Sequence, residues 1–61
     1  SDEGEIERAV KEVLAENTGA VADYKKGKTA SMQFLIGKAM GKLRGRGSPE
    51  ILKLFFTKYL T

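Results

Sequence analysis

Basic residues gather in the second half of the 61-residue chain, beside glycines. Lys38, Lys42, Arg44 and Arg46 fall within nine consecutive positions, next to Gly45. Ammonium and guanidinium groups bind phosphate, and a glycine turn lets a polyanion backbone come close. Cations are also favoured at a helix C-terminus by the helix dipole alone. Contact with phosphate and simple solvation are therefore both open for this cluster.

A second basic cluster surrounds an earlier glycine: Lys25, Lys26, Gly27 and Lys28. Its lysines offer mobile positive charge, which suits phosphate but does not read sequence. We expect the neighbouring Asp23 to cap a helix or to pair with one of these lysines. Tyr24 is expected in the core, with its hydroxyl at the rim.

Charge is distributed unevenly along the chain, whose net charge is +3. Residues 1–16 hold six acids and two bases, whereas residues 17–61 hold nine bases and two acids. The basic part is a candidate surface for a polyanion. Lysine and arginine also keep small helical domains soluble, so the asymmetry alone does not decide between these roles.

The composition argues against catalysis by this chain. It contains no His and no Cys, so the usual general base, the thiol nucleophile and most transition-metal ligands are missing. Asp23 and Glu50 are isolated acids among bases, which argues against a paired-carboxylate or magnesium site. No catalytic residue, metal site or cofactor site is predicted. The expected role is binding.

Apolar periodicity predicts an all-α fold, a compact small bundle of about four helices, over residues 2–15, 18–26, 29–44 and 49–60. A chain of this length holds one domain, residues 1–61, with a small core. In the first helix, Asp2 and Glu5 form a start that resembles a capping box. Acids also suit the positive end of a helix, so the acidic segment is explained structurally and is assigned no function.

Short polar residues and glycines predict the ends of the second and third helices. Asn17 or Thr18 is expected to cap the second helix with a side-chain oxygen, and Gly27 to end it. Thr29 opens the third helix. At the far end, Gly45 is expected to take the left-handed C-cap conformation.

The third helix has two apolar sides. One stripe comprises Met32, Leu35, Ile36, Ala39, Met40 and Leu43, and the opposite side Ala30, Phe34, Gly37 and Gly41. Both sides are predicted to be buried, which would place this helix at the centre of the bundle. Each glycine costs about 1 kcal/mol of helix propensity. Close approach of another helix or of a ligand backbone would compensate, and both interpretations are open. Lys38 and Lys42 must point to solvent.

The last helix begins with Ser48 as N-cap and Pro49 at its first position. Its predicted buried stripe comprises Ile51, Leu52, Phe55, Phe56, Tyr59 and Leu60, with Leu54 at the margin. The aromatic residues could stack on nucleic-acid bases, but their helical spacing favours the core.

These motifs together resemble a known family, the GatB/YqeY-type C-terminal tail domain of the B subunit of aspartyl/glutamyl-tRNA amidotransferase. The resemblance rests on Asn17, Val21, Asp23, Tyr24, Gly27, Lys28, Phe34, Leu35, Gly37, Met40, Gly45, Arg46 and Pro49, in the family's order and spacing. Two positions depart from the pattern. Gly47 stands where the family has Ala, and Lys38 where it has Gln. These changes alter flexibility and charge without altering the family.

The resemblance implies a non-catalytic tRNA-binding tail domain that positions misacylated tRNA for transamidation. The implied partners are tRNA(Gln) or tRNA(Asn) and, through a longer parent chain, the other amidotransferase subunits, with no membrane and no DNA. ATP, Mg²⁺ and the glutamine-dependent ligase chemistry would belong to the parent, and the location would be the cytoplasm. The implied tRNA-binding residues are Lys28, Lys38, Lys42, Arg44 and Arg46. The implied structural residues are Asn17, Tyr24, Gly27, Phe34, Gly37, Gly41, Gly45 and Pro49.

Three hypotheses of different classes remain. The first is the tRNA-binding tail, for which the start at Ser1 fits a fragment of a larger protein. The second is a helical module, like stand-alone relatives of the family, that binds an acidic protein partner through its basic face. The third is a general nucleic-acid binder without preference for tRNA. Selective binding of folded tRNA over duplex DNA separates the first from the others.

Overall fold

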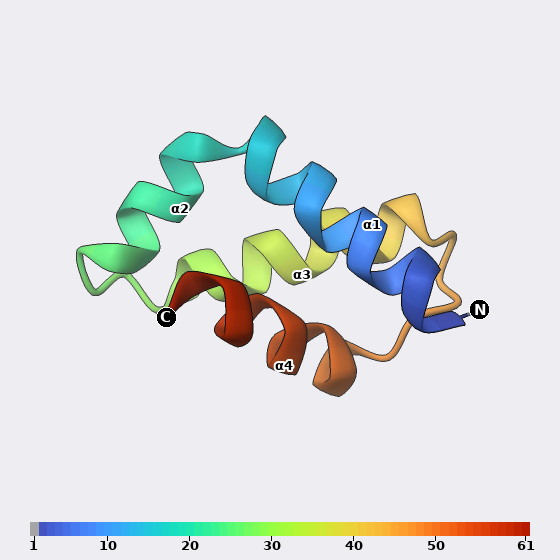
Figure 1. Cartoon of the computed structure of the whole chain (residues 1–61). Helices are drawn as coiled ribbons and strands as arrows, with labels where there is room; N and C mark the ends of the chain where they lie inside the picture. Colours follow the sequence, from blue (N-terminus) through green and yellow to red (C-terminus); the bar gives the residue numbers. More distant parts are fainter. Residues whose placement is uncertain (1) are drawn as a thin grey trace.

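The computed structural model describes residues 2–61, whose regular secondary structure is entirely α-helical (Figure 1). No strand occurs in this part of the chain. The structure comprises α1 (Asp2–Glu16), α2 (Thr18–Lys25), α3 (Ala30–Lys42) and α4 (Pro49–Leu60). The predicted class is confirmed, and each predicted helix end lies within two residues of the observed one. None of these helices is long and apolar enough to span a bilayer.

One face of α3 organises the core. The helix contacts each of the other three. Leu35 and Ala39 on this face are fully buried, and Met32, Ile36 and Leu43 are nearly so. The facing surfaces supply Val10 and Val13 of α1 and Leu52 and Phe56 of α4, all with no exposed area. The predicted apolar stripe of α3 is therefore confirmed, with Met40 only partly buried.

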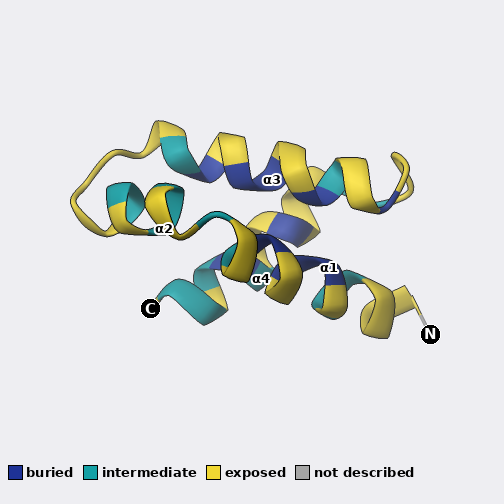
Figure 2. Cartoon of the chain, turned by 90° about the horizontal axis from the view of Figure 1, so that it is seen from above, coloured by how far each residue is buried: buried dark blue, intermediate teal, exposed yellow. Residues whose placement is uncertain are grey.

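The second apolar side predicted for α3 is not buried. Ala30, Gly37 and Gly41 are exposed, and Phe34 keeps 48% of its surface accessible. In Figure 2, α3 runs along one edge of the molecule, with its buried positions turned toward α1 and α4. The expectation of burial fails because the neighbouring helices are placed against a single face. Nothing within 4 Å would meet a Cβ at either glycine, so close helix packing does not explain them.

The stripe predicted for α4 is too wide. Leu52 and Phe56 are fully buried, whereas Ile51 is 42% and Leu54 70% exposed. Successive helical residues are rotated by about 100°. Ile51 therefore lies at the edge of the helix face whose centre is formed by Leu52 and Phe56. Contrary to expectation, its side chain stays accessible to solvent. Phe55, Tyr59 and Leu60 pack against the core while partly exposed.

Asn17 caps the helix before it, not the one after it. Its side chain makes no cap hydrogen bond to α2. Instead, its Nδ2 donates to the carbonyl of Val13 at 2.9 Å. The last turn of a helix leaves carbonyl acceptors unsatisfied, and the amide group provides a donor for one of them. The predicted capping of α2 by a side chain of Asn17 is therefore wrong.

Gly27 ends α2 as predicted. Its φ is +100°, and its N–H donates to the carbonyl of Tyr24 at 2.9 Å. The N–H of Lys28 reaches back to the carbonyl of Asp23 at 3.0 Å, which completes a Schellman motif. Ser48 likewise caps α4 as predicted, its Oγ accepting from the N–H of Ile51, with Pro49 in the first turn.

In the turn after α3, Gly45 takes the predicted left-handed conformation, but Arg44 before it is left-handed as well. Arg44, with φ of +54°, occupies the left-handed position directly after the C-cap Leu43. Gly45, with φ of +75°, follows it and donates its N–H to the carbonyl of Met40 at 2.9 Å. An L-residue in this conformation costs roughly 1–2 kcal/mol. Arg44 therefore occupies a strained backbone position, with Lys42 two residues before it and Arg46 two residues after it.

A polar contact joins the outer sides of α1 and α4. The hydroxyl of Tyr59 donates to a carboxylate oxygen of Glu7. This hydrogen bond, helped by the charge of Lys11, lowers the pKa of Glu7. The same bond raises the pKa of Tyr59, because it favours the protonated phenol. The contact holds the acidic helix against the last one.

Replacement of Leu35 tests the importance of the shared core face. We expect Leu35→Ala to lower the free energy of unfolding by about 2–5 kcal/mol, through lost burial and an unfilled cavity. A domain of this length has only about 3–9 kcal/mol in total. Urea unfolding followed by far-UV circular dichroism should therefore show a partly unfolded chain. Leu54→Ala, at an exposed leucine, should change the free energy by less than about 0.5 kcal/mol. Equal effects of the two changes would contradict the core described above.

Replacement of Arg44 tests the strained turn. Arg44→Gly should raise the free energy of unfolding by about 0.5–1 kcal/mol, because relief of left-handed strain outweighs the extra entropy of the unfolded chain. Arg46→Gly is the matched control, since it removes the same charge at a residue without positive φ and should not stabilise. Thermal melts of both variants provide the measurement. A loss of stability in Arg44→Gly would mean that the arginine side chain itself supports the turn.

Candidate nucleic-acid interface

The five predicted tRNA-binding residues follow α3 from end to end. Lys28 precedes the helix, Lys38 and Lys42 lie on it, and Arg44 and Arg46 follow it. All five are exposed. A helix of 13 residues is about 20 Å long. The structure therefore brings Lys42, Arg44 and Arg46 together at one end and leaves Lys28 at the other.

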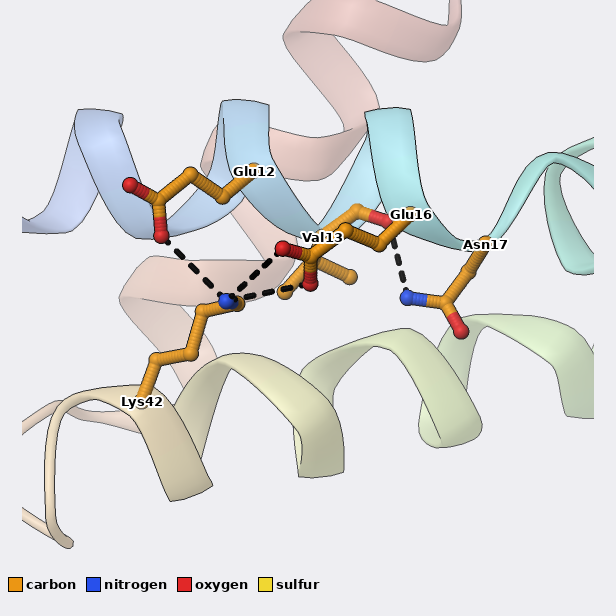
Figure 3. A network of polar contacts seen from close by, with 5 residues as sticks. All are labelled: Glu12, Val13, Glu16, Asn17 and Lys42. Atoms are coloured by element: carbon orange, nitrogen blue, oxygen red, sulfur yellow. Dashed lines mark hydrogen bonds and ion pairs between the residues drawn. The ribbon is translucent and has the colours of Figure 1, made fainter.

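Lys42 is held by two carboxylates of α1. Its Nζ lies 3.2 Å from Glu12 and 3.0 Å from Glu16 (Figure 3). The hydrogen bond to Glu16 raises the pKa of Lys42 most, and the hydrogen bond to Glu12 raises it further. Its side chain keeps only 31% of its surface accessible. The lysine charge is thus largely compensated within the molecule.

Arg46 makes a looser contact with the same acidic helix. Its Nη2 lies 3.4 Å from Glu5, and both side chains remain at least half exposed. Its Nε donates to the carbonyl of Leu43 at 3.2 Å, near the end of α3. An exposed pair of this kind contributes about 0–1 kcal/mol. The guanidinium is therefore available to an external phosphate at small cost.

Sequence reasoning missed the role of the acids on α1. They were explained by capping and by the helix dipole, yet Glu5, Glu12 and Glu16 pair with bases at the end of α3. Their spacing of seven and four residues places them on one helical face. That shared face is the sequence signal that could have indicated a basic neighbour.

The remaining candidate bases have no ion pair in residues 2–61. These are Lys28, Lys38 and Arg44, which lie before, on and after α3. The Nζ of Lys38 lies 5.3 Å from the ring centroid of Phe34, one turn earlier on the same helix. Beside them, Gly37 and Gly41 leave the helix backbone open to close approach. The outward face of α3 thus combines Lys38, an exposed aromatic ring and accessible backbone, and Lys28 and Arg44 lie just beyond the two ends of the helix.

The lysines around Gly27 do not use Asp23 as an ionic partner. No ion pair of this carboxylate occurs in the described part of the chain, contrary to one of the expected roles. The main-chain carbonyl of Asp23 instead accepts from the N–H groups of Lys26 and Lys28. The positive charge of this turn therefore remains exposed.

The chemistry available to this surface is binding of anions and flat rings. No group of three or more metal-ligating side chains occurs among residues 2–61. Five exposed cations lie on α3 or near its ends, and two of them, Lys42 and Arg46, pair with carboxylates of α1. Such cations can contact a phosphate backbone without reading its sequence.

Comparison with known proteins places this chain in a family. The family described as "GatB domain" matches residues 1–60. The B subunit of aspartyl/glutamyl-tRNA(Asn/Gln) amidotransferase from Brachyspira hyodysenteriae is 41% identical over 61 residues, which is 100% of this chain and 13% of the relative. The protein of the same name from Oleidesulfovibrio alaskensis is 47% identical over 60 residues, 98% of this chain and 13% of the relative.

A third relative gives a similar result. The protein of that name from Thermomicrobium roseum is 49% identical over 53 residues, 87% of this chain and 11% of the relative. The chain therefore spans little more than a tenth of the length of these relatives. No solved structure matches it. Because the family match covers nearly the whole chain, this protein belongs to the GatB domain family.

Proposed function

We propose that this chain is the tRNA-binding tail domain of an amidotransferase B subunit. In this role it binds misacylated tRNA while transamidation proceeds elsewhere in the parent protein. Its relatives are named as subunits of an aspartyl/glutamyl-tRNA(Asn/Gln) amidotransferase, and the chain corresponds to a small part of each. That correspondence supports an accessory role and not the complete reaction.

The observation that carries this proposal is the free charge along α3. Lys28, Lys38 and Arg44 are exposed cations without an internal ion pair in the described chain, and they stand beside an uncovered stretch of helix. Cations that neither fold the domain nor pair with its acids are suited to phosphate. Lys42 and Arg46 join them by exchanging their Glu partners for phosphate.

The partners follow from this role. The domain binds tRNA(Gln) or tRNA(Asn) and meets the other amidotransferase subunits through the parent chain, in the cytoplasm. As the family resemblance implies, ATP and Mg²⁺ serve the parent protein. It has no catalytic residue of its own.

A protein-binding role is the second candidate. Ile51 and Leu54 expose apolar surface on α4. Exposed apolar side chains on one helix suit a protein contact better than a nucleic acid. This candidate predicts no affinity for RNA, which separates it from the first.

Titration of the chain with labelled tRNA tests the proposal directly. We expect weak binding at low salt, stronger for folded tRNA than for duplex DNA of equal charge. Three to five phosphate contacts give a log–log salt slope of about −2 to −4. Equal binding of both nucleic acids would indicate a general binder, and binding of neither would favour a protein partner.

Charge removal identifies the contacting face. The double variant Lys38→Gln with Arg44→Gly should reduce the salt slope by about 0.7–0.9 for each lost phosphate contact. The second change also relieves backbone strain, so the variant should stay folded. Lys53→Gln with Lys58→Gln on α4 removes the same charge from another helix and should leave the slope nearly unchanged. If both double variants change the salt slope equally, the outward face of α3 is not the surface that contacts the tRNA.

Neutralising the acids that hold Lys42 tests its part in binding. Glu12→Gln with Glu16→Gln should tighten tRNA binding about two- to five-fold at low salt, because it frees the lysine and removes repulsion of phosphate. Asp2→Asn with Glu3→Gln, at acids without an ion pair in residues 2–61, controls for net charge. Weaker binding of the first double than of this control would mean that Lys42 acts only inside the fold.

A further inference from the structure

A groove lies between the α1–α2 corner and the start of α3. Its volume is about 530 Å³, which is within the range of small-molecule sites, and it is open to solvent. Phe34 and Ser31 of α3 line one part of it, and Asn17, Thr18 and Asp23 line another. One aromatic ring and several polar groups therefore meet in one hollow.

Phe34 is exposed where a core aromatic would be hidden. It keeps 48% of its surface accessible, because it faces away from the buried side of α3. A large aromatic surface in water is unfavourable unless a partner covers it. Every nucleobase has a flat face that stacks on such a ring, and unpaired RNA bases are commonly bound in this way.

The other part of the groove offers two side-chain acceptors, on Asn17 and Asp23, for which no donor is found among residues 2–61. Because the amide nitrogen of Asn17 donates to Val13, its oxygen is directed away from α1 and toward α3 (Figure 3). The half-buried carboxylate of Asp23 has no ion pair within residues 2–61. Amide and carboxylate oxygens accept from the N–H groups on the edge of a base. The groove thus fits a base that is stacked on one side and held at its edge.

The charges next to the groove fit the phosphate that accompanies a base. Lys38 lies four residues after Phe34, about 6 Å along the helix axis. Its Nζ lies over the Phe34 ring, 5.3 Å from the centroid. The groove's other carboxylate, Glu16, is paired with Lys42 at 3.0 Å, so its charge is largely compensated. A nucleotide seated here can therefore place its base on Phe34 and its phosphate on Lys38.

We propose that this groove binds one unpaired RNA base, stacked on Phe34 with its adjoining phosphate on Lys38. The proposal rests on the tRNA-binding function proposed above and deepens it. Phosphate contacts hold any RNA, whereas this groove requires a base that has left its pair. The domain then recognises unpaired bases in RNA loops in addition to phosphate groups.

Three variants at Phe34 test the stacking. Phe34→Ala should weaken binding of a tRNA transcript by roughly 5- to 150-fold, the range for loss of one stacked base. Phe34→Leu keeps apolar bulk without a π face and should also weaken binding, whereas Phe34→Trp should keep it. All three should melt near the unaltered chain by circular dichroism. Leu54→Ala, at another exposed apolar residue, should leave affinity unchanged.

Two further readouts separate stacking from charge. Phe34→Ala should leave the salt slope unchanged, because no cation is removed, and should not weaken binding to a fully paired RNA duplex. The chain has no other tryptophan, so fluorescence of the Phe34→Trp variant reports on the groove alone. Quenching by a short single-stranded RNA, and not by the duplex, is the expected result.

The outcomes distinguish this proposal from the function on which it rests. If the chain binds tRNA but Phe34→Ala binds equally well, the groove proposal is overturned and the tRNA-binding function stands. If the chain fails to bind tRNA while single-stranded RNA quenches the tryptophan, the groove proposal stands and the tail function falls. Absence of both binding and quenching overturns both.

Discussion

The whole structure depends on a single buried face of α3. Leu35 and Ala39 at its centre have no exposed area, and α1, α2 and α4 all contact this helix. A 61-residue chain can bury only about 60% of the surface that it exposes when unfolded. The apolar side chains of α1 and α4 converge on one side of α3 and leave the other open. The exposed helix face that could meet a ligand is thus a consequence of the small size of the core.

Charge serves two purposes at the end of α3. Lys42 is bound to Glu12 and Glu16, and Arg46 lies near Glu5. These pairs tie the acidic first helix to the basic end of the third, across a large separation in sequence. Each exposed pair contributes little to stability. The same carboxylates also compete with any external phosphate for those bases. The free cations Lys28, Lys38 and Arg44 are under no such competition.

Glycine and strain shape the two connections of α3 in different ways. Gly27 takes a left-handed conformation without steric penalty, as its lack of a side chain allows. At the opposite end an arginine takes the corresponding position, and the glycine comes one residue later. Strained residues often occur at functional sites, where surrounding structure maintains them. Arg44 is both strained and free of ion pairs in residues 2–61, which singles it out among the basic residues.

Local sequence determined the helices, their approximate ends and which residues share a face. Ser48 and Pro49 begin α4 and Gly27 ends α2 because hydrogen-bonding and backbone preferences there act within one or two turns. The periodicity likewise identified the stripe of Leu35 and Ala39. Periodicity does not say which neighbour covers a face, or whether any does.

Only the tertiary structure decided the rest. The exposure of Phe34, Gly37 and Gly41 depends on where the other helices pack, and the pairing of Lys42 depends on the position of α1. These features involve residues that are far apart in the sequence and meet only when the helices pack. The linear pattern of residue types does not say which of them will meet. The sequence by itself thus determined a helical GatB domain rich in bases, and packing decided which bases and which ring remain free to bind.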